Sequence, residues 1–151
     1  MPHNYYSEIN LHVTWHTKAS LPLLTPTVEP LVHRYIKQRV LAESSVFFHE
    51  IGGTETHIHL VVTIQPTVVV SERIGQWKGD SSHEVNKQLG PHGKVIQWQA
   101  GYGVVSFGTG DLDWVKAYVR NQRKHHTEGK TFERLERFAE LECDQDARER
   151  A

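Results

Sequence analysis

Thr56-His57-Ile58-His59-Leu60-Val61-Val62-Thr63-Ile64 is the stretch of the sequence that decides the fold. Side chains alternate across a β-strand, so this stretch predicts a strand over residues 57–64 with both histidines on one face. The opposite face then carries the aliphatic residues Ile58, Leu60 and Val62. The same segment therefore supplies a core strand and two imidazoles directed to the other side of the sheet.

Three further segments have the character of strands. Val46-Phe47-Phe48 begins a strand that Gly52-Gly53 ends, close enough to residues 57–64 for an antiparallel hairpin. Apolar and polar residues alternate over residues 9–16, which predicts a half-buried strand. Residues 95–107 are also strand-like, with Trp98, Tyr102 and Val104 on one face. Four strands are therefore expected.

Helical patterns separate these strands. Thr27 is a good N-cap for a first helix with Pro30 in its first turn, and apolar residues follow at 3–4 residue spacing. A second helix follows Gln65-Pro66 and is marked by Val70, Ile74 and Trp77. Ser81 with Glu84 forms a capping-box pattern, which predicts a separate short helix that Gly90 closes. The predicted order of elements is β-α-β-β-α-(α)-β-α.

This order predicts an α+β fold of the ferredoxin-like (RRM-like) class. Such a fold has a four-stranded antiparallel sheet with helices on one face. One helix is left over at the C-terminal end. It starts at Asp111 or Asp113 and runs to about Glu128.

The last predicted helix has two distinct faces. Leu112, Val115 and Val119 form an apolar stripe that is expected to face the core. The neighbouring face carries a phenol, an amide and an imidazole, which belong to Tyr118, Gln122 and His125. Between Trp114 and Thr127 the helix has four cationic side chains and no carboxylate.

Length and composition limit the function classes. The 151 residues fit a single domain, with a core over about residues 5–137 and a polar tail over residues 138–151. The single cysteine, Cys143, excludes an intramolecular disulfide framework and favours a reducing cytoplasm. No apolar run is long enough for a membrane span, so no membrane partner is expected. No Gly-rich phosphate loop is present, so no nucleotide cofactor is expected.

The net charge of −1 argues at first against a nucleic-acid partner. The charge is unevenly distributed, however. Residues 129–151 hold five Lys/Arg and seven Asp/Glu, whereas the rest of the chain holds twelve Lys/Arg and eleven Asp/Glu. The average therefore conceals a cationic predicted helix beside an acidic tail.

The histidine pair alone leaves two interpretations open. Two imidazoles on one sheet face can chelate a divalent ion, or they can simply be solvated polar residues. The helix with Tyr118 favours the first interpretation, an ion-binding histidine pair. Two motifs together resemble the single-tyrosine HUH transposases of small bacterial insertion sequences: His57-Ile58-His59 and Tyr118-x-x-Asn121-Gln122-x-x-His125-His126. Val13-Thr14-Trp15-His16-Thr17-Lys18 and Gly101-Tyr102-Gly103-Val104-Val105-Ser106-Phe107 also match, and the resemblance covers roughly residues 5–137.

The resemblance implies cleavage and rejoining of single-stranded DNA at the ends of a mobile element. Tyr118 would attack a phosphate and form a 5′-phosphotyrosine link, leaving a free 3′-OH. A divalent ion, Mg²⁺ or Mn²⁺, would polarise that phosphate. The residues that would hold the ion are His57, His59 and Gln122.

The resemblance also implies partners. The DNA ends would carry hairpins, and the protein would act as a homodimer in the cytoplasm of a bacterium or archaeon. The sequence leaves open whether the tyrosine helix serves its own subunit or the other one. Candidate DNA contacts are Arg120, Asn121, Arg123, Lys124 and His125.

Two other functions stay open at this point. A domesticated protein could bind DNA or RNA hairpins without cutting them, although the aromatic stacking motif of RNA-recognition domains is absent. A metal-dependent phosphoesterase is the other alternative. Histidine-triad hydrolases would need a third histidine where this chain has Val61, and they have no use for a tyrosine helix.

Overall fold

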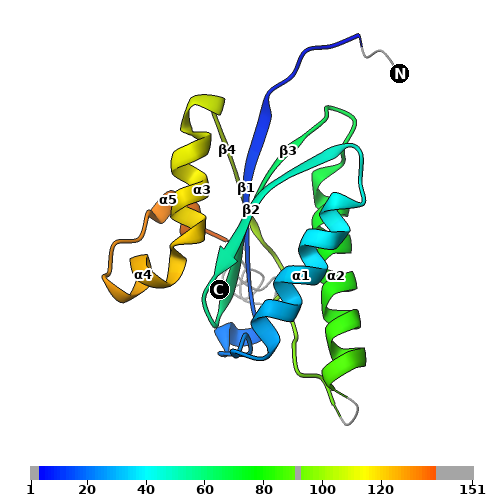
Figure 1. Cartoon of the computed structure of the whole chain (residues 1–151), viewed down its shortest axis with the longest axis vertical. Helices are drawn as coiled ribbons and strands as arrows, with labels where there is room; N and C mark the ends of the chain where they lie inside the picture. The colour runs from blue at the N-terminus through cyan, green and yellow to red at the C-terminus, as the bar shows by residue number, and fades with distance from the viewer. Residues whose placement is uncertain (1–3, 91–92, 139–151) are drawn as a thin grey trace, which may run out of the picture.

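The structure, a computed structural model, describes residues 4–90 and 93–138. Figure 1 shows the arrangement of the strands and helices. The elements are β1 (Ile9–His16), η1 (Lys18–Ser20), α1 (Val28–Leu41), β2 (Val46–Gly53), β3 (His57–Ile64), α2 (Val70–Leu89), β4 (Gly103–Phe107), η2 (Thr109–Asp111), α3 (Leu112–Arg120), α4 (Gln122–Thr127) and α5 (Glu133–Glu136). The polar tail over residues 138–151, with Cys143, lies outside the described residues except for residue 138.

The four strands form one antiparallel sheet in the order β2-β3-β1-β4. This is the order that the ferredoxin-like prediction requires, so the predicted fold class is confirmed. In the β1–β3 register, His16 lies opposite His57, Thr14 opposite His59 and His12 opposite Val61. Directly opposed residues project to the same side of a sheet, so β1 adds two more imidazoles to the face that holds the histidine pair.

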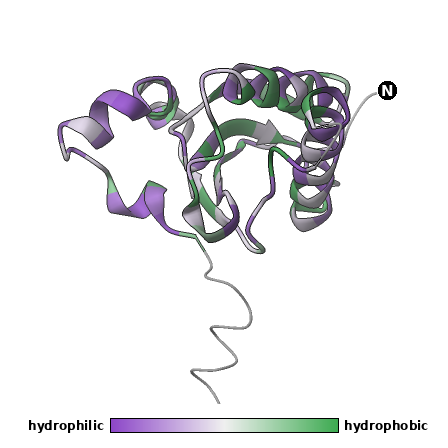
Figure 2. Cartoon of the chain, turned by 90° about the horizontal axis from the view of Figure 1, so that it is seen from below, coloured by the Kyte–Doolittle hydropathy of each residue, from purple (hydrophilic) through white to green (hydrophobic). Residues whose placement is uncertain are grey.

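One face of the sheet is covered by α1 and α2, which lie side by side in Figure 1. Their apolar faces pack on the aliphatic side of β1 and β3. Figure 2 shows the apolar residues gathered on the strands and the adjoining helix faces. Fully buried members of this core include Val32, Ile36, Ile74, Val13, Trp15, Ile58 and Leu60.

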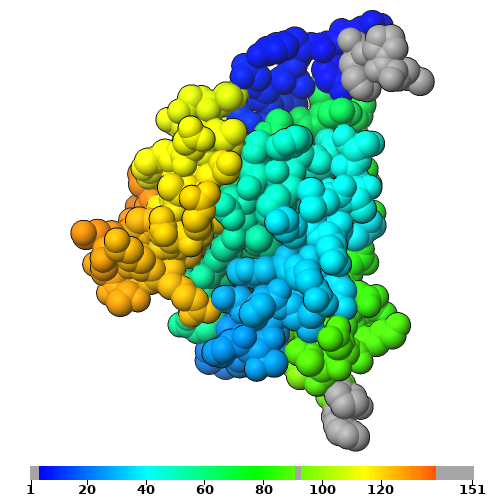
Figure 3. Space-filling model, in the orientation of Figure 1, coloured from blue at the N-terminus to red at the C-terminus, as the bar shows by residue number. Residues whose placement is uncertain are grey.

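The other face is covered by α3, as the apolar stripe predicts. Val115 and Val119 pack on Val61 of β3, and Leu135 of α5 completes this second, smaller core. Gly52 of β2 permits the close approach, because a Cβ there would lie 2.0 Å from the Val119 carbonyl oxygen. In Figure 3, α3 (yellow) accordingly lies directly against β2.

The predicted separate helix at Ser81 was wrong. α2 continues from Val70 to Leu89, and Ser81 is buried within it, with its hydroxyl donating to the Lys78 carbonyl at 3.0 Å. A serine can bond back to its own helix in this way, which is why the Ser81–Glu84 pattern does not mark a helix start. Gly90 does close the helix, through its N–H to the Asn86 carbonyl.

The predicted strand over residues 95–107 is shorter than expected, because only Gly103–Phe107 forms β4. In the segment that precedes β4, backbone groups bind the Asn86 side chain in place of a partner strand. Its Oδ1 accepts from the N–H groups of Val95 and Ile96 at 2.8 and 2.9 Å, and its Nδ2 donates to the Ile96 carbonyl. A single bridge between Thr17 and Trp98 is the remaining sheet-like contact of this segment.

The tyrosine helix was predicted to be continuous to about Glu128, and this was also wrong. It breaks at Asn121, whose φ of −102° and ψ of 27° are not helical. The Asn121 side chain donates to the Ala117 carbonyl at 2.9 Å, a local bond that competes with the helical pattern. None of the helices in the described part of the chain has the length and apolar character needed to cross a bilayer.

Candidate functional site

The strand β3 places His57 and His59 on the sheet face beneath α3 and α4, as predicted. His59 is completely buried and His57 is 3% exposed. Burial lowers the pKa of His57 to about 4 and lowers the pKa of His59 well below its ordinary value. Both imidazoles are therefore neutral near pH 7, the form in which a ring nitrogen offers its lone pair to a metal ion.

Each of these imidazoles is held by its Nδ1 atom. Nδ1 of His57 lies 3.0 Å from the hydroxyls of both Thr54 and Thr56. Nδ1 of His59 lies 2.7 Å from Nε2 of His12, which is buried on β1. The Nε2 atoms of His57 and His59 are both buried, and neither forms a hydrogen bond of good geometry within residues 4–90 and 93–138.

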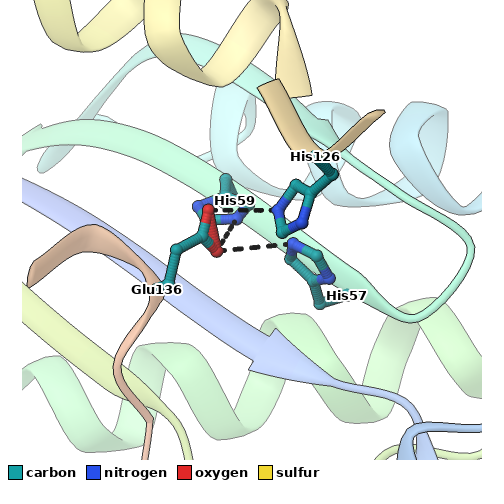
Figure 4. A group of neighbouring side chains, drawn as sticks. All are labelled: His57, His59, His126 and Glu136. Carbon is teal, nitrogen blue, oxygen red and sulfur yellow. Dashed lines mark hydrogen bonds and ion pairs between the residues drawn. The ribbon is translucent and has the colours of Figure 1, made fainter. Parts of the chain in front are cut away.

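Two residues from later in the chain complete a cluster around these Nε2 atoms. His126 comes from α4 and Glu136 from the end of α5, and the four ligand atoms lie within 4.8 Å of one another. Figure 4 shows the carboxylate of Glu136 directed between the imidazoles. Its Oε2 lies 3.1 Å from Nε2 of His59 and 3.5 Å from Nε2 of His57, and its Oε1 lies 3.2 Å from Nε2 of His126.

Tyr118 lies beside this cluster and shares the carboxylate with it. Its hydroxyl donates to Oε1 of Glu136 at 2.8 Å and accepts the backbone N–H of Phe132 at 2.7 Å. Its ring stacks on His125, with centroids 4.8 Å apart. Burial, together with Glu136, raises the pKa of Tyr118 to about 12 against the opposing effect of the Phe132 N–H.

Gln122 is the first residue of α4 and is almost fully buried. Its Nε2 donates to the Tyr118 carbonyl at 3.2 Å, and its Oε1 lies 3.1 Å from Nε2 of His126. The predicted residues Tyr118, Gln122, His57 and His59 thus come together in spite of the helix break. The ring of His125 stacks on the tyrosine ring, and its expected role as a DNA contact stays a prediction.

A pocket of about 510 Å³ opens next to the cluster. It gives a ligand access to the exposed edge of the site. Its lining residues are His16, Thr54, Glu55, Thr56, His57, Arg123, His126, Thr127 and Glu136.

The cations expected to contact DNA differ in their surroundings. Arg120 pairs with Glu50 at 3.0 Å, and Arg123 pairs with Glu29 at 2.6 Å and Glu55 at 3.5 Å. Lys124 is exposed and forms no ion pair with any described residue. The side chain of Asn121 is engaged in the break between α3 and α4.

Sequence reasoning missed three members of the site. His12 belongs to the polar side of β1, and the strand alternation already placed it on the same face as the histidine pair. His126 lies one helical turn after Gln122, with its Nε2 3.1 Å from Oε1 of Gln122, so helical spacing from Gln122 could have indicated it. Glu136 follows Leu135 and reaches the site because Leu135 packs on α3, a contact that no local sequence signal indicates.

The donor set fits a divalent ion. Two buried Nε2 atoms, a third imidazole and a carboxylate face one point, and a side-chain amide lies next to them. Imidazole and carboxylate donors together suit first-row divalent metals and, through the oxygen donors, Mn²⁺ and Mg²⁺. The described residues therefore form a cluster that could hold a divalent ion next to a tyrosine hydroxyl.

Comparisons with known proteins agree with this geometry. A structure from Deinococcus radiodurans R1, provisionally assigned as a transposase, superposes with a TM-score of 0.63 and 16% identity over 86% of this chain and 96% of that one. The REP-associated tyrosine transposase bound to a REP hairpin superposes with a TM-score of 0.57 and 17% identity over 87% of this chain and 75% of that one.

At these identities the superpositions show a shared fold. No curated protein sequence matches the chain. The profile of the family described as "Transposase IS200 like" matches residues 5–122, which is most of the sequence. The chain therefore belongs to the IS200-like transposase family.

Proposed function

We propose that this transposase cleaves and rejoins single-stranded DNA through a 5′-phosphotyrosine intermediate formed by Tyr118. The observation that carries the proposal is the shared carboxylate of Glu136. One of its oxygens accepts from the Tyr118 hydroxyl, and the other lies 3.1 Å from the buried Nε2 of His59. The nucleophile and the predicted metal ligands are thus joined through a single side chain.

A protonated phenol is a poor nucleophile, and the groups around Tyr118 supply a proton acceptor and a hydrogen-bond donor for its oxygen. A hydroxyl with a pKa of about 12 is protonated near neutral pH, so attack requires a proton acceptor. Oε1 of Glu136 already accepts that proton in a hydrogen bond, and the Phe132 N–H stabilises negative charge on the phenol oxygen. Attack would form the bond between the Tyr118 oxygen and phosphorus as Glu136 takes the phenol proton. The bond to the 3′ oxygen would break, and that oxygen would take up a proton from water to leave a 3′-OH.

His57 and His59 would hold a divalent ion, Mg²⁺ or Mn²⁺, through their Nε2 atoms. We place Gln122, His126 and Glu136 around the same ion as further donors. The bound ion would polarise the scissile phosphate and neutralise charge that develops on it. The outer bonds to Thr54, Thr56 and His12 would keep the two imidazoles oriented toward it.

The proposed substrate is single-stranded DNA with hairpins at the ends of a mobile element. One superposed transposase is bound to a REP hairpin, which supports a hairpin partner for this chain. Lys124, with Arg120, Asn121, Arg123 and His125 nearby, is the proposed contact surface for phosphates. We further propose that the protein acts as a homodimer in the cytoplasm of a bacterium or archaeon.

The decisive experiment is covalent trapping. Purified protein is incubated with labelled hairpin-bearing single-stranded DNA and Mn²⁺ or Mg²⁺, and adducts that resist SDS are counted. The wild type and Tyr35→Phe, which loses a hydroxyl on the distant α1–α2 surface, are expected to form the adduct. Tyr118→Phe and the His57→Ala/His59→Ala double variant are expected to form none.

Three results would overturn the assignment. An adduct formed by Tyr118→Phe would show that another residue is the nucleophile. Hairpin binding by the wild type without any adduct would favour the alternative of a hairpin-binding protein that does not cut. Release of cleaved DNA without a covalent link would instead indicate a metal-dependent phosphoesterase.

A further inference from the structure

His12 is a buried imidazole that the proposed chemistry does not use directly. It lies on β1 and is 0% exposed, and its Nε2 is 2.7 Å from Nδ1 of His59. The two ring centroids are 4.8 Å apart. A contact this short between two neutral rings requires that one nitrogen donates a proton and the other accepts it.

Two proton arrangements satisfy this contact. In the first, Nε2 of His12 donates to Nδ1 of His59, so the proton of His59 sits on its own Nε2. In the second, Nδ1 of His59 donates to Nε2 of His12, and Nε2 of His59 carries a free lone pair. Only the second arrangement allows His59 to bind a metal ion through Nε2.

The neighbouring carboxylate selects between these arrangements. Oε2 of Glu136 lies 3.1 Å from Nε2 of His59. A ring-nitrogen lone pair 3.1 Å from a carboxylate oxygen is repelled by its negative charge, whereas an N–H at the same distance is attracted even where the angle is poor for a hydrogen bond, so the first arrangement is favoured without a cation. A cation at the cluster replaces that proton and makes the second arrangement the favoured one.

We propose that His12 is a positioning residue that sets the tautomer of His59, and that the two rings exchange tautomers together when a divalent cation binds. This inference rests on the proposed role of His59 as a metal ligand. His12 acts through His59 and touches neither the ion nor DNA.

The tautomer of His57, the other histidine of the pair, is not fixed by a neighbouring imidazole. Nδ1 of His57 lies next to two threonine hydroxyls, and each hydroxyl can donate or accept after rotating. His12 has no rotatable hydrogen, and its Nδ1 has no hydrogen-bond partner among the described residues. A change from the first arrangement to the second therefore requires a proton to move to the buried Nδ1 of His12. Binding of a metal ion to His59 thus changes the tautomer of both rings.

The first experiment reads the tautomers directly in the wild type. ¹⁵N-histidine NMR spectra, assigned with His12→Gln and His59→Gln, are recorded for the metal-free protein and for the protein loaded with diamagnetic Zn²⁺. We expect the proton of His59 on Nε2 without metal and on Nδ1 with Zn²⁺, with the proton of His12 moving from Nε2 to Nδ1. Identical tautomers in the two states would overturn the proposal.

The second experiment measures Mn²⁺ affinity by electron paramagnetic resonance without DNA. His12→Leu removes the acceptor for Nδ1–H of His59 and is expected to weaken Mn²⁺ binding about 10- to 100-fold, as loss of an outer-shell partner does. His12→Gln is expected to restore affinity to within a few-fold of the wild type, because an amide oxygen can accept the same hydrogen bond. The control is His33→Leu. His33 lies on α1, and burial lowers its pKa as well, but its replacement should leave the Mn²⁺ affinity unchanged.

The outcomes separate this inference from the proposed function. An unchanged Mn²⁺ affinity in His12→Leu, with binding lost in His59→Gln, would overturn the role of His12 and leave the metal site intact. Failure of the wild type to bind Mn²⁺ would overturn both the site and the inference. Weakened binding in His12→Leu without rescue by His12→Gln would show that His12 serves only packing.

Discussion

At the scale of single residues, Glu136 links the parts of the proposed site. Its two oxygens face different partners, Tyr118 and the imidazoles. The carboxylate is 17% exposed in its side chain, so its interactions are only partly screened by water. A change that keeps its shape but removes its charge should therefore alter both the metal affinity and the tyrosine.

We expect Glu136→Gln to weaken Mn²⁺ binding at least about tenfold, because an anionic donor is lost from the cluster. The pKa of Tyr118 should fall from about 12 toward its ordinary value of 10.0 but stay above it, since burial remains. Electron paramagnetic resonance gives the affinity, and a ¹³C NMR titration of the tyrosine rings gives the pKa.

The matched control is Glu133→Gln. Glu133 lies on the same short helix, and its carboxylate pairs with Arg137 at the surface. Both measured quantities should stay at their wild-type values in this variant. If Glu136→Gln bound Mn²⁺ as tightly as the wild type, Glu136 would not be a metal ligand.

At the scale of elements, the close packing of α3 on β2 positions Tyr118 over the histidines. Gly52 is the point of closest approach, and its hydrogen faces the backbone of Val119. A methyl group there would meet the Val119 carbonyl oxygen at 2.0 Å and its carbon at 2.9 Å. Because these are backbone atoms, the clash can be relieved only by moving α3.

We expect Gly52→Ala to lower the free energy of unfolding by about 1–3 kcal/mol, the range typical of overpacking. The displaced α3 should also weaken adduct formation by Tyr118. Gly75→Ala is the control, because Gly75 lies inside α2 and a Cβ there meets no atom within 4 Å.

That control should raise the free energy of unfolding by about 0.5–1 kcal/mol, because alanine is the better helix former. Urea unfolding followed by circular dichroism measures both variants. Equal stability of Gly52→Ala and the wild type would show that α3 does not rest on β2 as the structure places it.

The elements also show what the sequence could and could not predict. Alternation in residues 57–64 and in residues 9–16 determined both faces of the sheet, because each strand has one apolar side and one polar side. Local signals failed where a side chain bonded to the backbone, as Ser81, Asn86 and Asn121 do. Whether such a side chain begins, replaces or breaks an element depends on its tertiary surroundings.

The same limit applied to the site. His57, His59, Tyr118 and Gln122 could be identified because they occur in spaced motifs within two elements. Glu136 belongs to no such motif. It reaches the site only because the chain turns back after α4 and packs Leu135 against α3, a long-range contact that spacing does not encode.

At the scale of the whole molecule, burial of several imidazoles should make stability depend on pH. Burial lowers the pKa of His16, His33 and His57 from 6.5 to about 4. The unfolded chain therefore binds protons at a higher pH than the folded one. The stabilisation is complete above about pH 6.5 and is lost as the pH falls toward 4.

We expect the free energy of unfolding to decrease over this interval by up to about 1.4 kcal/mol per pH unit for each such histidine. Urea unfolding at pH 7.5, 5.5 and 4.5 measures the decrease. His33→Leu removes one of the three groups at a position away from the cluster and should reduce the slope. An unchanged slope in that variant would contradict the lowered pKa of His33.

The arrangement of one chain also bears on how two copies would cooperate. Tyr118 contacts Glu136 of its own chain, and that carboxylate contacts His59 of the same chain, so the residues of the proposed site meet within one chain. If each subunit works alone, mixing Tyr118→Phe with His57→Ala/His59→Ala should form no covalent adduct, because neither chain holds both the nucleophile and the histidines. If the tyrosine helix exchanged between subunits, mixed dimers would contain one complete site and would recover part of the wild-type yield. We expect no recovery, since exchange of α3–α5 would have to separate Val119 from Gly52 and Glu136 from His57 and His59, and exchange of α3 alone would also break the Tyr118–Glu136 and Tyr118–Phe132 hydrogen bonds.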